Sequence, residues 1–192
     1  GYASGKIPDY QMSAMAMAVL SACGGAKPEP LTPEIAKADA AREARATFQI
    51  FLDHLKAQPS DTSAWLTIQM PPEGAERPQA ELSLRNIVQT DKSFSGVIWK
   101  PDRNWPEFPT GATMSFPASI VIDWVYVADE KTVGGYQLRA KTCLASQPMN
   151  GVPELTAQHL RAEAEEAAAF LIDPKKACAP YDVRKDLEDK AK

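Results

Sequence analysis

Two short segments of this 192-residue chain read IDWVYV (residues 122–127) and GGYQLR (residues 134–139). In the first segment Ile122, Trp124 and Tyr126 alternate with Asp123 and two valines, and the second segment alternates in a similar way. Alternation with a period of two is typical of a β-strand with one buried face. We therefore predict strands at residues 120–128 and 133–141 that pair as an antiparallel hairpin.

The register of this hairpin follows from the requirement that like faces meet. Pairing Trp124 with Leu138 and Tyr126 with Tyr136 brings the apolar faces together, because a shift by one residue would turn every side chain to the other face. This pairing leaves a three-residue loop at 130–132. We expect Trp124, Tyr126 and Tyr136 to be core aromatics; the alternative is that they form a recognition surface.

The same register sets Asp123 opposite Arg139. One interpretation is a cross-strand ion pair, worth about 0.2–1 kcal/mol. The other places both residues on the floor of a small polar ligand site, since a glycine such as Gly135 allows a ligand to approach the backbone closely. A bulge at Gly134-Gly135 is the alternative role for the glycines, and it would keep the same parity. Asp123, Gly135 and Arg139 are therefore candidate binding residues, together with the three aromatics.

Helical and strand patterns flank the hairpin. Thr32-Pro33-Glu34 predicts the start of a helix, and an apolar stripe with spacings of three and four extends it to about Ala57. A second helical pattern begins near Pro153 and ends before Pro174. Short strands are predicted at residues 64–70, 80–88, 94–99 and 113–116. The fold class is therefore α+β, with an N-terminal helix, an antiparallel twisted sheet of about five to six strands and a C-terminal helix.

A proline-rich segment at residues 101–111 interrupts the strand pattern and contains Trp105 and Phe108. Its three prolines favour an ordered excursion over a floppy loop. Exposed aromatic rings in such a segment often mark a surface that a partner covers. We therefore predict that Trp105 and Phe108 contribute to a partner-binding patch.

Four motifs occur in a distinctive order: Phe94-Ser95-Gly96-Val97, Gly111 through Phe116, Asp123-Trp124-x-Tyr126, and Gly134-Gly135-Tyr136. This order resembles the YegJ-like family of small bacterial proteins, the domain of unknown function 2314, over about residues 35 to 142. The resemblance implies an α+β domain, often exported, without an established activity to transfer. The long segment at 101–109 and the C-terminal helix with Cys178 depart from the family pattern. We assign residues 33–150 to the YegJ-like domain and 151–192 to a helical extension.

The N-terminal region resembles the signal of a bacterial lipoprotein. An apolar run from Met12 to Leu20 is followed by Ser21-Ala22-Cys23, the order of a lipobox with the cysteine that would be lipidated. This interpretation makes residues 1–22 a signal peptide and 23–32 a tether, and Gly24 favours the outer membrane by analogy. The alternative is an exposed, disordered tail with a chance cysteine.

Cys143 and Cys178 form an even pair once Cys23 is assigned to acylation. In an oxidising compartment such a pair is expected to form a structural disulfide. The alternative is two buried free thiols. A closely spaced cluster of cysteine and histidine is absent from the sequence, which holds only two histidines, so we predict no metal site and no cofactor.

Composition and motifs reduce the classes of function that the sequence supports. The net charge of −4 and the isoelectric point near 5.3 give no general attraction to nucleic acid. The sequence contains no Gly-x-Ser-x-Gly elbow, Walker loop or Gly-x-Gly-x-x-Gly motif. We predict a noncatalytic binding module, lipid-anchored and facing the periplasm or the cell exterior, whose partner is an envelope protein or component. The alternatives are an envelope enzyme with a carboxylate-based site near Asp123, and a cytoplasmic protein.

Overall fold

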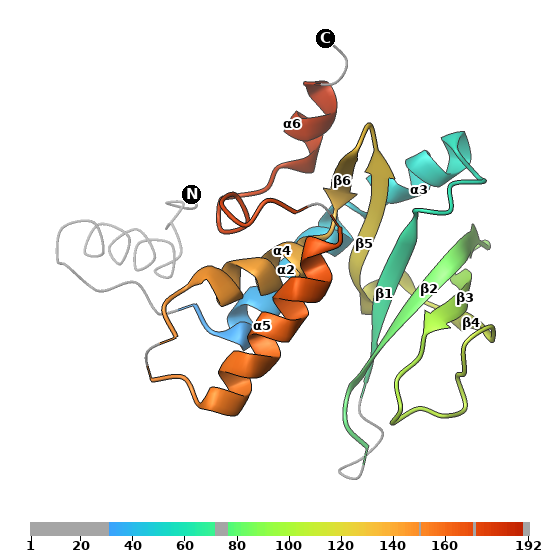
Figure 1. Cartoon of the computed structure of the whole chain (residues 1–192). Helices are drawn as coiled ribbons and strands as arrows, with labels where there is room; N and C mark the ends of the chain where they lie inside the picture. The colour runs from blue at the N-terminus through green and yellow to red at the C-terminus, as the bar shows by residue number, and fades with distance from the viewer. Residues whose placement is uncertain (1–30, 72–76, 150, 171, 190–192) are drawn as a thin grey trace, which may run out of the picture. The chain divides into compact units, whose positions relative to one another are not determined.

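The computed structural model describes residues 31–71, 77–149, 151–170 and 172–189. Its centre is a six-stranded antiparallel sheet with the strand order β4-β3-β2-β1-β5-β6 (Figure 1). The strands are β1 (Trp65–Met70), β2 (Ala80–Gln89), β3 (Phe94–Lys100), β4 (Thr113–Phe116), β5 (Val121–Ala128) and β6 (Lys131–Gly134). A 3₁₀ turn, η1 (Ala118–Ile120), precedes β5. The first five strands match the predicted ranges closely, and the α+β class is confirmed.

In the described part of the sequence, two helices precede the strands and three follow them. They are α2 (Pro33–Ala46), α3 (Phe48–Ala57), α4 (Tyr136–Ser146), α5 (Glu154–Ala168) and α6 (Val183–Glu188). Helix α2 begins as predicted, with Pro33 in its first turn and the Thr32 hydroxyl accepting the backbone N–H of Ile35 at 3.2 Å. Helix α5 contacts α4 along its length, and α4 also contacts α2 (Figure 1).

The single helix expected over residues 33–57 is divided at Thr47. Its backbone leaves the helical region, with φ of −111° and ψ of 8°. The Thr47 hydroxyl donates to the carbonyl of Glu43 at 2.8 Å and lies 2.7 Å from the hydroxyl of Tyr136. A threonine that bonds to the preceding turn bends helices, and here a second partner from α4 holds it in place. The break therefore depends on a contact 89 residues away in the sequence.

The sheet has two differently packed faces. Leu66 and Trp124 face the main apolar core, which α2 and α3 cover. Their neighbours Trp65 and Val125 point the opposite way and pack with Leu138 and residues that follow α5. The main core is made of residues from both helices and the six strands, among them Ala44, Phe48, Phe51, Ile68, Leu82, Leu84, Ile98, Phe116, Trp124 and Val133. Burial alternates along β3 and β4. Strand β5, which was predicted to bury one face, is buried on both faces over its first six residues, as is β1 over its first four.

The hairpin at residues 120–141 is the main correction to the predicted fold. Strand β6 is only four residues long, and it pairs Tyr126 with Val133 and Ala128 with Lys131. The turn consists of two residues, Asp129 and Glu130, with φ of 50° and 60°. Such a turn matches the twist of the paired strands. The predicted register, which paired Trp124 with Leu138, is wrong because residues 136–146 form α4 rather than a strand.

Two glycines convert the end of β6 into the start of α4. Gly134 and Gly135 adopt φ of 77° and 71°, which side chains with a Cβ rarely adopt. A Cβ on Gly134 would lie 2.3 Å from the carbonyl oxygen of Trp124, so only glycine fits against β5 there. Residues 136–141 alternate as a strand would, but the turn at Gly134-Gly135 directs them into a helix instead.

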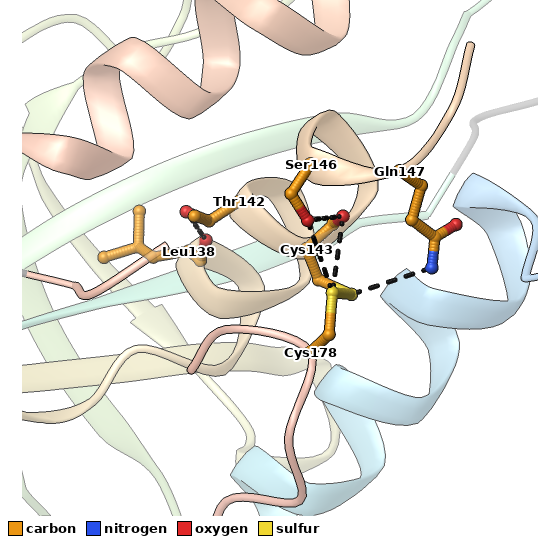
Figure 2. Close-up of a disulfide and its surroundings, with 6 residues drawn as sticks. All are labelled: Leu138, Thr142, Cys143, Ser146, Gln147 and Cys178. Atoms are coloured by element: carbon orange, nitrogen blue, oxygen red, sulfur yellow. Dashed lines mark hydrogen bonds between the residues drawn. A yellow bond between two sulfur atoms is a disulfide. The ribbon is translucent and has the colours of Figure 1, made fainter. Parts of the chain in front are cut away.

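A disulfide between Cys143 and Cys178 joins α4 to the segment after α5 (Figure 2). The two Cα atoms are 4.7 Å apart, and the bond closes a loop of residues separated by 35 positions. Ser146 donates to the carbonyl of Cys143 at 2.7 Å, and its hydroxyl lies 3.4 Å from the sulfur of Cys178. The predicted pairing is confirmed. Among the described residues, no helix is long and apolar enough to cross a membrane.

Candidate binding pocket

A pocket of about 190 Å³ lies between the sheet face that carries Trp65 and the helices α4 and α5. We call it the helix–sheet pocket. Its polar lining includes Thr67, Ser83, Asp123, Gln137, Lys141 and Glu163, together with Glu81, Lys100 and Glu166. Trp65, Leu138 and Phe170 supply apolar walls. The pocket exists because this sheet face carries small polar residues at a place where the opposite face carries Leu66, Ile68 and Leu82.

The floor of the pocket is formed by two hydroxyl side chains. Thr67 of β1 and Ser83 of β2 are direct cross-strand partners, and their hydroxyl oxygens are 3.2 Å apart. Both residues are buried. Cross-strand hydroxyl pairs stabilise the local register, and their remaining lone pairs and protons face the same side of the sheet.

Asp123 is the most deeply buried charged residue in the lining, at 1% exposure. Its carboxylate accepts backbone N–H groups from Trp124 at 2.9 Å, Tyr136 at 2.8 Å and Gln137 at 3.0 Å. Two of these donors belong to the first turn of α4, whose N-cap residue, Gly135, has no side chain to serve as a cap. Asp123 therefore performs the capping from a neighbouring strand, where it also meets the positive end of the helix dipole.

Burial raises the pKa of Asp123 to about 7, although the three N–H donors act in the opposite direction. Desolvation disfavours the charged form of a carboxyl group, while hydrogen bonds to the carboxylate favour it. In this site desolvation is the stronger effect. The group therefore changes its charge near neutral pH.

Gln137 presents a buried hydrogen-bond acceptor at the pocket. Its Nε2 atom donates to the carbonyl of Lys37 at 2.9 Å and to the carbonyl of Ile122 at 3.3 Å. Its Oε1 atom is buried and accepts no hydrogen bond from the residues that the structure describes. An unsatisfied buried acceptor costs about 1–3 kcal/mol, so a donor from outside the protein would stabilise this site.

Glu163 of α5 also has a buried acceptor oxygen without a hydrogen-bond donor among the described residues, in this case on a charged side chain. Its Oε1 atom is 3.6 Å from Lys141 Nζ and 3.8 Å from Lys37 Nζ, with His159 Nε2 also at 3.6 Å. Its Oε2 atom is buried and, within the described part of the chain, has no hydrogen-bond partner. At the pocket mouth Lys100 forms an ion pair with Glu166. Burial, and then repulsion by Lys141, lowers the pKa of Lys100.

Arg139 does not pair with Asp123, which corrects the expected cross-strand ion pair. Its guanidinium donates to the carbonyls of Gly134 at 2.9 Å and Thr132 at 3.1 Å, and it lies 3.6 Å from the ring centre of Tyr181. Arg139 lines a separate pocket. The pairing failed because Arg139 belongs to the first turns of a helix, and so its side chain leaves the hairpin face.

The three predicted core aromatics are buried: Trp124, Tyr126 and Tyr136. The indole N–H of Trp124 donates to the carbonyl of Ala44 at 2.9 Å. The Tyr126 ring stacks on His54 with 3.6 Å between ring centroids. Their contacts are thus with the protein interior. Among the candidate residues, Gly135 contributes through its left-handed backbone at the start of α4.

Trp105 is 2% exposed, which corrects the expectation of an exposed ring. The guanidinium of Arg77 lies 3.5 Å from the centre of the ring, and the Trp105 indole N–H donates to the carbonyl of Pro78 at 3.5 Å. Phe108 is half-buried and stacks on Trp105 with 6.1 Å between centroids. The excursion is ordered as predicted, but its larger aromatic ring is covered by the preceding segment.

Of the residues that line the helix–sheet pocket, Asp123 was a candidate from the sequence and the others were not, among them Gln137, Lys141 and Glu163. The sequence patterns place Gln137 on a predicted strand and Glu163 within the predicted helix that begins near Pro153. A single sequence holds no local signal for such residues, since they meet only after α4 and α5 pack together. Cys23 lies outside the described residues. Within the described ranges, no group of three or more His, Cys, Asp or Glu residues could hold a metal ion.

A comparison with known families matches residues 35–147 to "Uncharacterized protein conserved in bacteria (DUF2314)". The chain belongs to the DUF2314 family. The resemblance seen in the sequence is thereby confirmed. No curated protein and no solved structure gives a match. The DUF2314 segment contains Asp123, Gln137 and Lys141, whereas Glu163 and Cys178 lie beyond it. One wall of the helix–sheet pocket is therefore supplied by sequence outside the family segment.

Proposed function

We propose that this DUF2314 protein is an exported, lipid-anchored binding protein of the bacterial cell envelope that does not catalyse a reaction. The observation that carries the binding role is the helix–sheet pocket, in which the buried Gln137 Oε1 has no donor among the described residues. A protein interior leaves few polar groups unpaired, and an external donor would complete this one. The expected partner is an envelope component, and no role for nucleic acid is proposed.

The disulfide supports the location. Bonds between cysteines persist in oxidising compartments and are rare in the cytosol. Cys143 and Cys178 are bonded, which suggests an extracytoplasmic location and disfavours the cytoplasmic alternative. The lipobox-like order at residues 20–23 supplies the proposed anchor, with lipid attached to Cys23 and residues 23–32 as a tether to the domain.

The geometry of Asp123 favours binding over the alternative of a carboxylate-based enzyme. A pKa near 7 suits a general acid or base. However, a catalytic carboxylate must reach a substrate atom, and both oxygens of Asp123 already accept backbone N–H groups. Breaking these bonds would uncap α4. Asp123 is therefore proposed to hold the pocket wall in place rather than to transfer protons.

Fractionation of a bacterial host that expresses the chain tests the location and the anchor. Growth with radiolabelled palmitate is expected to label the wild type, and Cys23→Ala is expected to lose the label and leave the membrane fraction. Mass spectrometry of unreduced protein is expected to find Cys143 and Cys178 bonded in both. Equal labelling of the two proteins would disprove the lipid anchor. Free thiols at Cys143 and Cys178 in the native host would disprove the extracytoplasmic location.

A further inference from the structure

Two residues that line the helix–sheet pocket, Gln137 and Glu163, each have a buried oxygen that lacks a donor among the described residues, Gln137 Oε1 and Glu163 Oε2. We propose that this pocket binds a small ligand that carries a primary ammonium group, which donates hydrogen bonds to these two oxygens. The proposal rests on the binding function proposed above and adds the chemical class of the ligand. An ammonium group has three donors and no acceptor, so it complements a pair of acceptors.

The orientation of the Gln137 amide is determined by its neighbours. Its Nε2 atom donates to two backbone carbonyls, those of Lys37 and Ile122. Exchanging the nitrogen and the oxygen would place Oε1 against those carbonyls and would lose both bonds. Oε1 is therefore the atom left for a ligand, on a residue that is 6% exposed. A ligand with only acceptors would gain nothing from it.

Glu163 adds charge to this acceptor pair. The ammonium groups of Lys37 and Lys141 and the ring nitrogen of His159 lie 3.6–3.8 Å from its Oε1 atom, which is longer than a hydrogen bond. Its Oε2 atom is left without a donor within the described part of the chain. A hydrogen bond from an ammonium group to this oxygen would be assisted by charge and therefore stronger than a neutral one.

The charges around the pocket favour a cation over an anion. Its lining contains three glutamates, Glu81, Glu163 and Glu166, against two lysines, Lys100 and Lys141. One negative charge remains before Asp123 is counted, and ionisation of Asp123 adds another. Lys37 offsets part of this charge from outside the lining. A carboxylate ligand would face both the excess negative charge and the two acceptor oxygens.

The dimensions of the pocket limit the ligand to a small one. Its volume of about 190 Å³ is below the range of roughly 300–1,000 Å³ typical of drug-sized ligands. The Trp65 and Phe170 rings, with centroids 5.3 Å apart, form an apolar wall on which a short carbon chain can pack. The inferred class is therefore an alkylammonium compound no larger than an amino acid or an amino sugar.

Titration of the full-length, disulfide-bonded protein by two-dimensional ¹H–¹⁵N NMR tests this proposal. Butylammonium chloride is the probe of the class, and sodium butyrate and butanol are the matched anion and neutral compound. We expect butylammonium to shift the side-chain amide of Gln137 and the indole N–H of Trp65 in a saturable manner. Butyrate and butanol are expected to leave them unchanged. D-alanine and glucosamine then distinguish an amino acid source from an amino sugar source.

Two variants on α5 provide the matched control. Glu163→Gln keeps the shape but removes the charge, and is expected to weaken butylammonium binding by about tenfold or more. Glu165→Gln changes an exposed residue of the same helix and is expected to bind like the wild type. Thermal melts verify that both variants are folded.

Three outcomes would overturn the proposal: no saturable shift with any ammonium probe, equal binding of butyrate, or equal affinity of the two variants. Binding of butyrate at the same resonances would keep the binding function and reject only the ligand class. A failure of palmitate labelling, in contrast, would reject the anchor and leave this titration unaffected.

Discussion

The carboxylate of Asp123 in β5 accepts the backbone N–H of Tyr136 at 2.8 Å, and through it a strand provides the missing cap of a helix. The two residues are 13 positions apart, on either side of β6 and the glycine turn. Together with the turn at Gly134-Gly135, this contact sets where α4 begins. Since Gln137 and Lys141 both lie on α4, it also fixes one wall of the helix–sheet pocket.

Replacing Asp123 by alanine is expected to destabilise the protein. The change leaves three buried N–H groups without their acceptor and uncaps α4, which together cost roughly 2–4 kcal/mol. Urea denaturation at pH 4, followed by circular dichroism, measures the loss. Asp91→Ala, at an exposed position between β2 and β3, is the control and is expected to change stability by less than about 0.5 kcal/mol. Similar losses of stability in both variants would show that Asp123 does not cap α4.

The stability conferred by Asp123 is expected to depend on pH. Its pKa is about 7 in the folded protein against 3.8 for the unperturbed group, so the folded state binds more protons between these values. Its contribution is therefore fully present below about pH 4 and is lost as the pH rises through 7. The difference in unfolding free energy between wild type and Asp123→Ala should shrink from pH 4 to pH 8, by up to about 1.4 kcal/mol per pKa unit. A difference that grows or stays constant would contradict the raised pKa.

Removal of the disulfide is expected to lower stability by about 3–4 kcal/mol, because the unfolded chain regains the entropy of a loop of about 35 residues. The double variant Cys143→Ser/Cys178→Ser tests this by urea denaturation without reductant. Cys23→Ser keeps the bond and should unfold like the wild type. Reductant should destabilise the wild type but leave the double variant unchanged. Insensitivity of the wild type to reductant would show that the bond contributes little.

Gly134→Ala is expected to be far more damaging than Gly111→Ala. Both glycines have a positive φ, of 77° and 90°, and both changes therefore incur a backbone penalty of about 1–2 kcal/mol. Only at Gly134 would the new Cβ meet neighbouring atoms, the carbonyl oxygen and ring of Trp124, whereas Gly111 has open space around it. We expect Gly134→Ala to lose roughly 3 kcal/mol or more in thermal or urea unfolding. Equal losses would show that the contact with Trp124 can relax.

Local patterns predicted most of the sheet correctly. Segments such as 80–88 and 113–116 alternate within themselves, and their strands need only a buried face to form. The helix start at Thr32 was likewise predictable from the sequence, since an N-cap residue and a proline act within three residues. The break of the helix at Thr47 could not be predicted from the sequence, because the second hydrogen-bond partner of the Thr47 hydroxyl is the hydroxyl of Tyr136, 89 residues away. The covering of Trp105 was missed for the same reason, since it depends on Arg77 from a distant segment.

The positions of the first five strands, the first helix start, the cysteine pair and the family resemblance were already present in the residues, because each depends on neighbours along the chain or on composition. The helical state of residues 136–146 was decided by tertiary structure, since their alternating pattern suits a strand until Asp123 caps them and the glycine turn redirects them. The helix–sheet pocket was decided in the same way. Gln137 and Glu163 become neighbours of one cavity only when α5, held near α4 by packing and followed by the disulfide, closes over the polar face of the sheet.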